Sequence, residues 1–398
     1  MRRPVLFPVA VVVVALVALM ACEASPDQTP GGTLAADTPA VPGDSPAPIV
    51  PGDTPAAPGD TPAAPGDTPQ TGSPAPPQPT GGRLALVQSR GQLICGVNGG
   101  LPGFSFLEQG TGAYSGFDVD YCRALAAAVL GDPDAVEYRQ LSTDDRGPAL
   151  QLGEIDVLIR NTTWTVSRDT QWGLFGPTTF YDGQGLMVLA EVGADSIDDL
   201  GGATVCVQSG TTTELNLADA MAAAGHEGNY TTQVFDNIDE TYNTYESGAC
   251  DVVTSDRSQL VSRRTTMADP SAHILLEDTI SKEPLGPVVP FGDEEWFNVV
   301  KWTVFATIEA EEFGITQANV EEMRDTSENP VVQRLLDVNP PEHSLGLEEG
   351  WAVNVISAVG NYGEIFERNV GPNTPLGLDR GLNNLWTEGG LIYAPPYR

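Results

Sequence analysis

The chain has 398 residues, and its 54 acidic side chains outnumber its 19 lysines and arginines so far that the formal net charge is −35. A field of this sign repels the phosphates of DNA and RNA, which disfavours a nucleic-acid-binding role. The length exceeds what one simple hydrophobic core usually supports, so we expect two folded lobes.

The first 22 residues have the pattern of an export signal. Two arginines precede an apolar run at residues 5–21, which at about 17 residues is marginal for a membrane span. The end of this run, Leu19-Met20-Ala21-Cys22, resembles the lipobox of bacterial lipoproteins, in which the cysteine is lipidated and becomes the mature N-terminus. We therefore expect a membrane anchor on Cys22. The alternative is an ordinary secretory signal with an incidental cysteine.

Residues 23–82 have the composition of an unfolded tether. They contain sixteen prolines and no aromatic or basic residue, and the heptad Gly-Asp-Thr-Pro-Ala-Ala-Pro occurs at 52–58 and again at 59–65. Such a chain cannot bury enough apolar surface to fold, and its prolines favour an extended polyproline II conformation. We predict a spacer between the anchor and a folded part that begins at residue 83.

Four cysteines lie in the folded part, and an exported protein meets an oxidising compartment, so disulfides are expected. Three pairings are possible. We favour Cys95–Cys122 and Cys206–Cys250, because each pair then stays within one segment of the chain. Without a CxxC spacing, and with three histidines far apart, the sequence does not predict a metal site.

Apolar runs alternate with helical patterns in the first segment of the folded part. We predict strands at 93–97, 136–141 and 155–159, and helices at 118–130 and 146–152. This βαβαβ order predicts an α/β fold with a mostly parallel sheet and helices on both of its faces.

A second unit repeats this pattern, with strands at 203–208, 232–235, 251–254 and 273–276, and helices at 212–224, 239–247 and from about 256. The apolar segments 185–189 and 285–289 are predicted to cross between the lobes as a two-strand hinge that allows closure on a ligand. A long amphipathic helix at 294–313 is expected to return to the first lobe, with Trp296, Val299, Val300, Val304 and Ile308 facing inward. Residues 330–398 give a poorer secondary-structure signal.

Three places in the sequence offer polar groups for a small ligand. The strand at 155–159 runs into Arg160-Asn161-Thr162-Thr163-Trp164-Thr165-Val166-Ser167-Arg168, where Arg168 offers a fork for a carboxylate and Thr163 a hydroxyl. Ser209-Gly210-Thr211-Thr212-Thr213-Glu214 has the form of a capping box at a helix start, whose free amides also suit an anion. Asp256 follows the strand at 251–254 and can accept from an ammonium group.

Each of these features also has a purely structural interpretation: a surface ion pair for Arg168, a plain helix cap for Thr211, and a helix N-cap for Asp256. Together they predict a site for an α-amino acid, because they offer a cation and a helix start for a carboxylate and an aspartate for an amine. Phe104 is either an apolar wall of this site or a core residue.

Segments at 91–104, 116–124, 160–169, 205–216, 280–287, 360–364 and 393–396 carry a family likeness, for example Gly116-Phe117-Asp118-Val119-Asp120-Tyr121-Cys122-Arg123-Ala124. From about residue 91 to the C-terminus, the chain resembles the periplasmic solute-binding proteins of polar amino-acid ABC transporters, most closely the general L-amino-acid-binding branch. The resemblance implies a two-lobed, type II periplasmic-binding-protein fold. It also implies that no cofactor is needed.

The resemblance further implies roles for individual residues. Arg168 would clamp the ligand α-carboxylate with help from Thr163, Thr211 and Thr212, and Asp256 would take the α-ammonium. Asn161 would add a backbone carbonyl, and Asn98 and Gln208 stand at side-chain positions of the ligand, whereas Arg146 and Arg160 either join the site or pair within the acidic domain. The complete set of expected ligand-binding residues is Asn98, Phe104, Asn161, Thr162, Thr163, Arg168, Gln208, Ser209, Thr211, Thr212 and Asp256.

We therefore expect a lipid-tethered, monomeric receptor outside the cytoplasm that passes L-amino acids to an ABC permease. Its expected parts are the signal at 1–22, the tether at 23–82, the first lobe at 83–187, the second lobe at 188–285, and a return to the first lobe with a C-terminal extension at 286–398. A dehydratase-like enzyme on the same fold, or a sensory module, is the alternative. The sequence shows no Ser-His-Asp order and places no histidine near the crevice segments, which disfavours an enzyme.

Overall fold

The computed structural model of the chain describes residues 82–337 and 345–398. Cys22, the predicted signal at 1–22 and all but the last residue of the predicted tether at 23–82 lie outside the described residues. Within the described ranges, no helix is both long and apolar enough to cross a bilayer.

The first lobe is built on a sheet with strand order β5-β1-β6-β15-β7. Strand β1 is parallel to both neighbours, whereas β15 is antiparallel to β6 and β7. The alternate residues Leu93, Cys95 and Val97 of β1 are completely buried, as expected for a central strand with both faces covered. The strands are β1 (Leu93–Val97), β5 (Val136–Gln140), β6 (Val157–Leu158), β7 (Leu174–Phe175) and β15 (Val288–Val289).

A small meander joins β1 to the first long helix, and it consists of β2 (Gly100–Leu101), β3 (Ser105–Leu107) and β4 (Tyr114–Ser115). Gly116 then turns the chain with φ of 127°, and a Cβ there would lie 2.2 Å from the carbonyl oxygen of Phe104. The helices that follow along the chain are α2 (Phe117–Leu130), α3 (Arg146–Gln151) and α4 (Val166–Gln171).

The second lobe repeats the arrangement with the strand order β11-β10-β12-β9-β13. Strand β10 is parallel to β11 and β12, and β9 is antiparallel to β12 and β13. These strands are β9 (Gln184–Leu189), β10 (Thr204–Gln208), β11 (Thr231–Phe235), β12 (Val252–Asp256) and β13 (His273–Leu275), and the helices are α5 (Thr212–Ala223), α6 (Ile238–Glu246) and α7 (Arg257–Arg264). The α/β class and the mostly parallel sheets are as predicted.

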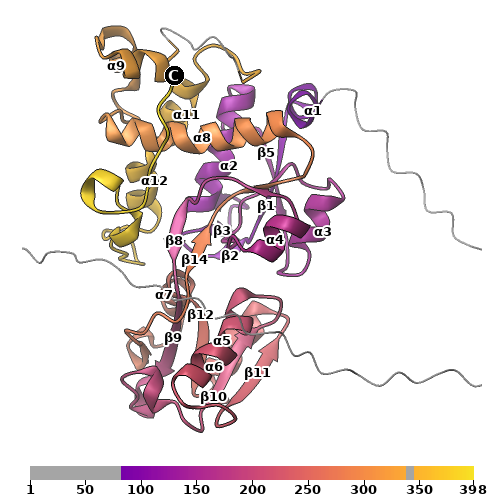
Figure 1. Cartoon of the computed structure of the whole chain (residues 1–398), viewed down its shortest axis with the longest axis vertical. Helices are drawn as coiled ribbons and strands as arrows, with labels where there is room; N and C mark the ends of the chain where they lie inside the picture. The colour runs from indigo at the N-terminus through magenta and orange to yellow at the C-terminus, as the bar shows by residue number, and fades with distance from the viewer. Residues whose placement is uncertain (1–81, 338–344) are drawn as a thin grey trace, which may run out of the picture. The chain divides into compact units, whose positions relative to one another are not determined.

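The crossings between the lobes differ from the prediction. They are β8 (Phe180–Asp182) and β14 (Glu283–Leu285), which pair antiparallel as a separate two-stranded sheet (Figure 1). The predicted crossing at 185–189 is instead part of β9 in the second sheet, which starts before the predicted lobe boundary after residue 187. The other predicted crossing, at 285–289, contains the end of β14 and then β15 of the first sheet. Apolarity alone misplaced the crossings because the apolar runs belong to the buried strands β9 and β15, whereas β8 and β14 each contain an acidic residue.

Helices from the C-terminal part of the chain complete the first lobe. As predicted, α8 (Glu294–Glu312) buries Trp296, Val299, Val300, Val304 and Ile308. The weakly patterned region after residue 330 nevertheless forms helices, and one of them, α11, packs against α2 and α8. The remaining helices are α1 (Arg83–Arg90), α9 (Val320–Thr326), α10 (Pro330–Leu335), α11 (Trp351–Val359) and α12 (Tyr362–Asn369).

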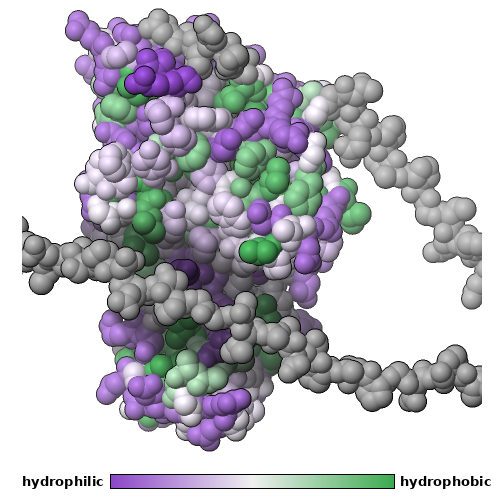
Figure 2. Space-filling view, in the orientation of Figure 1, coloured by the Kyte–Doolittle hydropathy of each residue, from purple (hydrophilic) through white to green (hydrophobic). Residues whose placement is uncertain are grey.

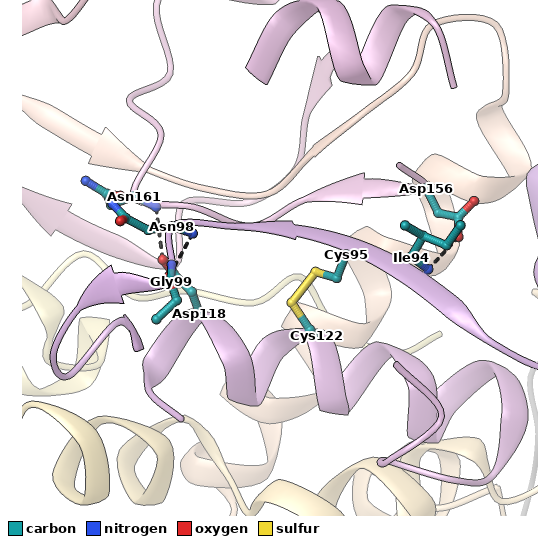
Figure 3. The surroundings of a disulfide bond; sticks show 9 residues. Ile94, Cys95, Asn98, Gly99, Asp118, Cys122, Asp156 and Asn161 are labelled. Atoms are coloured by element: carbon teal, nitrogen blue, oxygen red, sulfur yellow. Dashed lines mark hydrogen bonds between the residues drawn. A yellow bond between two sulfur atoms is a disulfide. The ribbon is translucent and has the colours of Figure 1, made fainter. Parts of the chain in front are cut away.

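Both expected disulfides are present. Cys95 on β1 is bonded to Cys122 on α2 (Figure 3). Cys206 on β10 is bonded to Cys250 just before β12. Each bond therefore links two elements of the same lobe.

Hydrophilic and hydrophobic residues are interspersed on the face of the protein shown in Figure 2. Several large apolar side chains are exposed, among them Leu152, Val166 and Leu215. Exposed apolar residues of this kind are normal on a protein surface and need no functional explanation when they are scattered singly.

Candidate functional site

A cavity lies between the two lobes, at the ends of β6, β10 and β12. Open α/β sheets usually bind ligands at the carboxyl ends of their parallel strands. The first lobe contributes Thr143, Arg146, Arg160, Asn161, Thr163 and Arg168, and the second contributes Gln208, Thr211, Thr212, Thr213, Ser255, Asp256 and Gln259.

The loop after β6 is fixed to the hinge, which sets the position of Arg168. Thr163 forms a β-bridge with Leu285 of β14, and the hydroxyl of Thr165 caps α4 by accepting from the Arg168 amide at 3.2 Å. The Arg168 guanidinium donates to the Thr163 carbonyl at 3.1 Å and lies 4.9 Å from the centre of the Trp172 ring. These contacts fix the orientation of this side chain in the cavity.

Arg168 is 7% exposed, and burial lowers its pKa, although the negative charges of Asp256 and Glu283 oppose this shift. An arginine remains charged under such conditions. A buried cation of this kind gains most from an anion that comes with the ligand, because water supplies little stabilisation there.

Two further buried arginines line the same cavity. Arg146 donates from Nε to the Thr143 carbonyl at 2.9 Å, and Arg160 donates from Nε to the Leu141 carbonyl at 3.1 Å. Burial and repulsion among the guanidiniums lower the pKa of Arg146 well below its ordinary value, and burial lowers that of Arg160 to about 10.

The second lobe presents the start of α5 to the cavity. The Thr211 hydroxyl accepts from the Glu214 amide at 3.0 Å, as in the predicted capping box. The Glu214 carboxylate, however, accepts from the Gly210 amide at 2.9 Å. Thr212 donates its hydroxyl to the Glu283 carboxylate at 2.8 Å, so the hinge strand β14 holds the start of this helix.

Asp256 closes the cavity from the end of β12. It occupies the N-cap position of α7 but makes no side-chain capping hydrogen bond, so the purely structural interpretation of this residue does not apply. Burial raises the pKa of Asp256 well above its ordinary value, with further contributions from the carboxylates of Asp182 and Glu283. An ammonium group beside it would stabilise the ionised form.

Contacts across the cavity join the lobes directly. Asn161 donates its side-chain amide to the Gln259 carbonyl oxygen at 3.1 Å, and the hydroxyls of Thr163 and Thr212 lie 3.4 Å apart. The Ser262 hydroxyl donates to the Pro102 carbonyl at 2.7 Å. Groups from both lobes therefore face one shared cavity.

Comparison with known proteins identifies the family. The model of the bacterial extracellular solute-binding proteins, family 3, matches residues 93–313. The general L-amino acid-binding periplasmic protein AapJ of Rhizobium johnstonii is 52% identical over 319 residues, covering 79% of this chain and 92% of that protein. The chain belongs to this family.

Other relatives agree with this assignment. The glutamate/glutamine/aspartate/asparagine-binding protein BztA of Rhodobacter capsulatus is 49% identical over 314 residues, which cover 78% of this chain and 92% of BztA. The structure of an ABC transporter periplasmic binding protein from Brucella ovis with glutathione bound is similar to this solute-binding protein, with a TM-score of 0.76 and 50% identity. That match covers 79% of this chain and 99% of the Brucella chain.

Most of the residues selected from the sequence line the cavity of this solute-binding protein. Those brought together there are Asn161, Thr163, Arg168, Gln208, Thr211, Thr212 and Asp256.

Four expected residues do not line the cavity. Phe104 is completely buried and packs on Phe180, with ring centres 5.1 Å apart, so it is a core residue. Thr162 donates its hydroxyl to the Arg160 carbonyl, and Ser209 donates to the Asp236 carboxylate at 2.9 Å. Both hydroxyls therefore stabilise local structure.

Asn98, the fourth of these residues, does not line the cavity but contacts the lining residue Asn161. Asn98 lies beside Asn161 (Figure 3) and donates to its side-chain oxygen at 3.2 Å. The side-chain amide of Asn161 in turn donates to Gln259. The Asn161 backbone N–H donates to Asp118 at 2.9 Å. Asn98 and Asp118 thus orient a cavity residue instead of lining the cavity themselves.

Sequence reasoning missed Thr143, Thr213, Ser255 and Gln259 as cavity residues, and it left Arg146 and Arg160 undecided. Three of the missed residues directly neighbour positions that were selected or follow in the next helical turn, so the signal was present at the strand ends. Thr143 lies in the loop before α3 and has no comparable signal.

Proposed function

We propose that this protein captures a free L-amino acid between its two lobes and delivers it to the membrane permease of an ABC transporter. The observation that carries the proposal is the placement of Arg168 and Asp256 in one cavity, on different lobes and both buried. A buried cation and a buried anion facing one small space suit a zwitterion.

In this proposal, the α-carboxylate of the ligand pairs with the Arg168 fork and accepts from Thr163 and from the start of α5. The α-ammonium donates to Asp256. Each lobe supplies one half of the clamp, so the ligand binds more tightly when the two lobes are closed on it than when they are apart. This difference in affinity is what stabilises the closed arrangement.

The names of the relatives support this class of ligand. AapJ is a general L-amino acid-binding protein, BztA is a glutamate, glutamine, aspartate and asparagine-binding protein, and the Brucella protein holds glutathione. All of these molecules contain an α-amino acid group.

A thermal-shift screen of the purified full chain with the twenty amino acids tests the proposal. A ligand that binds only the folded state stabilises it by about 2.7 kcal/mol at a hundred times its dissociation constant. We expect at least one amino acid to raise the melting temperature by several degrees. If no amino acid changes the melting temperature, the proposal is wrong.

The enzyme alternative is tested on the same samples. A receptor returns its ligand unchanged, so mass spectrometry after prolonged incubation is expected to recover the amino acid without a new product. A new product that forms only when the protein is present would favour the hypothesis of a dehydratase-like enzyme. Uptake of labelled amino acid by cells with and without the protein separates a transport role from a purely sensory one.

We also propose that the protein is a monomer anchored to the membrane through lipidated Cys22, with residues 23–82 as the spacer. The lipobox-like sequence and the proline-rich composition support this arrangement. Labelling cells with radioactive palmitate is expected to mark the wild-type protein and not the Cys22→Ser variant. Equal labelling of both would overturn the anchor, and sedimentation of the Cys22→Ser protein measures its oligomeric state.

A further inference from the structure

The cavity contains more positive charge than a simple amino acid can neutralise. Arg146, Arg160 and Arg168 are 3%, 6% and 7% exposed, and all three line it. Among the described residues, no carboxylate oxygen lies within 4.0 Å of a guanidinium nitrogen of these three arginines, so none of them forms an ion pair. Asp256 is the one carboxylate among the lining residues.

An α-amino acid with a neutral side chain leaves this imbalance in place. Its carboxylate pairs with Arg168 and its ammonium with Asp256, and the ligand adds no net charge. Asp118 attracts Arg160 from behind the cavity, but it already accepts from the backbone of Asn161. The exposed carboxylate of Asp144 also attracts Arg146, but it forms no ion pair with it. Arg146 and Arg160 would then remain buried beside each other without an ion-paired anion, which is costly.

An unused hydroxyl stands beside these two arginines. Thr143 is 4% exposed, and its Oγ1 has no hydrogen-bond partner among the described residues. Its carbonyl accepts from Arg146, so the hydroxyl and the guanidinium belong to the same corner of the cavity. Buried hydroxyls nearly always have a partner, and a ligand oxygen would provide one here.

We infer that Arg146, Arg160 and Thr143 form a second anion subsite and that the preferred ligand is an α-amino acid carrying a second carboxylate. This inference rests on the proposed function and names the ligand class within it. The two arginines donate to the second carboxylate, and the Thr143 hydroxyl donates to one of its remaining lone pairs.

The second carboxylate has two chemical sources. It is the side chain of a free acidic amino acid, or it is the C-terminal carboxylate of a γ-glutamyl peptide such as glutathione. Titration calorimetry of the purified full chain with L-glutamate, L-aspartate, L-glutamine and glutathione distinguishes them. We expect at least one dicarboxylate to bind ten-fold or more tightly than glutamine.

The outcomes separate this inference from the proposed function. Glutamine binding as tightly as every dicarboxylate would overturn the second subsite and leave the amino-acid receptor standing. Absence of binding by any amino acid or by glutathione would overturn both. Tight binding of glutathione alone would uphold the subsite and assign it to the peptide.

Variants test the assigned residues. Arg146→Gln and Arg160→Gln are each expected to reduce the preference for the dicarboxylate over glutamine five-fold or more. Arg139→Gln is the matched control, because Arg139 is an exposed arginine paired with Glu137 outside the cavity, and it should leave the preference unchanged.

An unchanged preference in folded Arg146→Gln and Arg160→Gln proteins would overturn the inference. If a variant does not fold, L-glutamate and its γ-methyl ester on the wild-type protein still decide the question. The ester removes the second charge and keeps the α-amino acid group. The subsite would be overturned if glutamate and its ester bind equally tightly and no other dicarboxylate binds more tightly than they do.

Discussion

Replacing Arg168 with alanine removes the group that we expect to hold the ligand α-carboxylate. Arg168 is 7% exposed, and its orientation is fixed by the Thr163 carbonyl and the Trp172 ring. Losing one partner of a buried, hydrogen-bonded charge pair costs about 2 to 5 kcal/mol, mostly because the other charge stays buried without a partner. This range corresponds to a dissociation constant that is roughly 30- to 5,000-fold larger.

The same substitution affects folding much less than binding. It removes one hydrogen bond, worth about 0.5 to 1.5 kcal/mol, but also relieves the burial of a charge. We therefore expect a thermal unfolding midpoint within a few degrees of the wild type, measured without ligand, and a loss of affinity measured by calorimetry.

Arg168→Lys provides the comparison for this prediction. Lysine keeps the positive charge but cannot present two parallel donors to a carboxylate, so we expect an affinity between those of the wild type and the alanine variant. Near-native affinity in a folded Arg168→Ala protein would refute the assignment of this residue.

Three further predictions concern stability. Gly116→Ala should lower the unfolding free energy in urea by about 3 kcal/mol or more, because the new methyl group would lie 2.2 Å from the Phe104 carbonyl oxygen, and an unchanged midpoint would contradict this. Burial raises the pKa of Glu309 from 4.5 to about 7, so this group favours unfolding increasingly as pH rises between those values. Glu309→Gln should therefore stabilise the protein by about 3 kcal/mol at pH 8 and by almost nothing at pH 4, whereas an equal gain at both would exclude the ionisation as its cause. Replacing Cys206 and Cys250 together by serine should cost roughly 4 kcal/mol of stability, since the bond closes a loop with a sequence separation of 44, and a loss below ~1 kcal/mol would show that loop entropy is not the main contribution.

The sequence predicted the elements that build the site because local patterns determine them. The runs that became β1, β10 and β12 are apolar and bounded by polar or turn residues, and parallel strands bring their carboxyl ends to one edge. Arg168 lies in α4, the helix after β6, and Asp256 is the last residue of β12, so they could be assigned to one cavity although 88 positions separate their numbers.

Features set by tertiary packing were harder to predict. The hinge strands β8 and β14 have three residues each and include Asp182 and Glu283, so neither contains an apolar run that would predict a strand. Helix α11 is buried against α2, so its sequence lacks the polar face that marks a surface helix. Phe104 is equally plausible as a wall or a core residue until Phe180, distant in sequence, is placed against it.

The central claim is that one cavity between the lobes holds both charged ends of an amino acid. A crystal structure of the protein with the amino acid that gives the largest thermal shift tests this claim most directly. We predict that the ligand α-carboxylate lies about 3 Å from the Arg168 guanidinium and the α-ammonium about 3 Å from the Asp256 carboxylate. A ligand bound outside this cavity, or bound in it with neither contact, would contradict the claim.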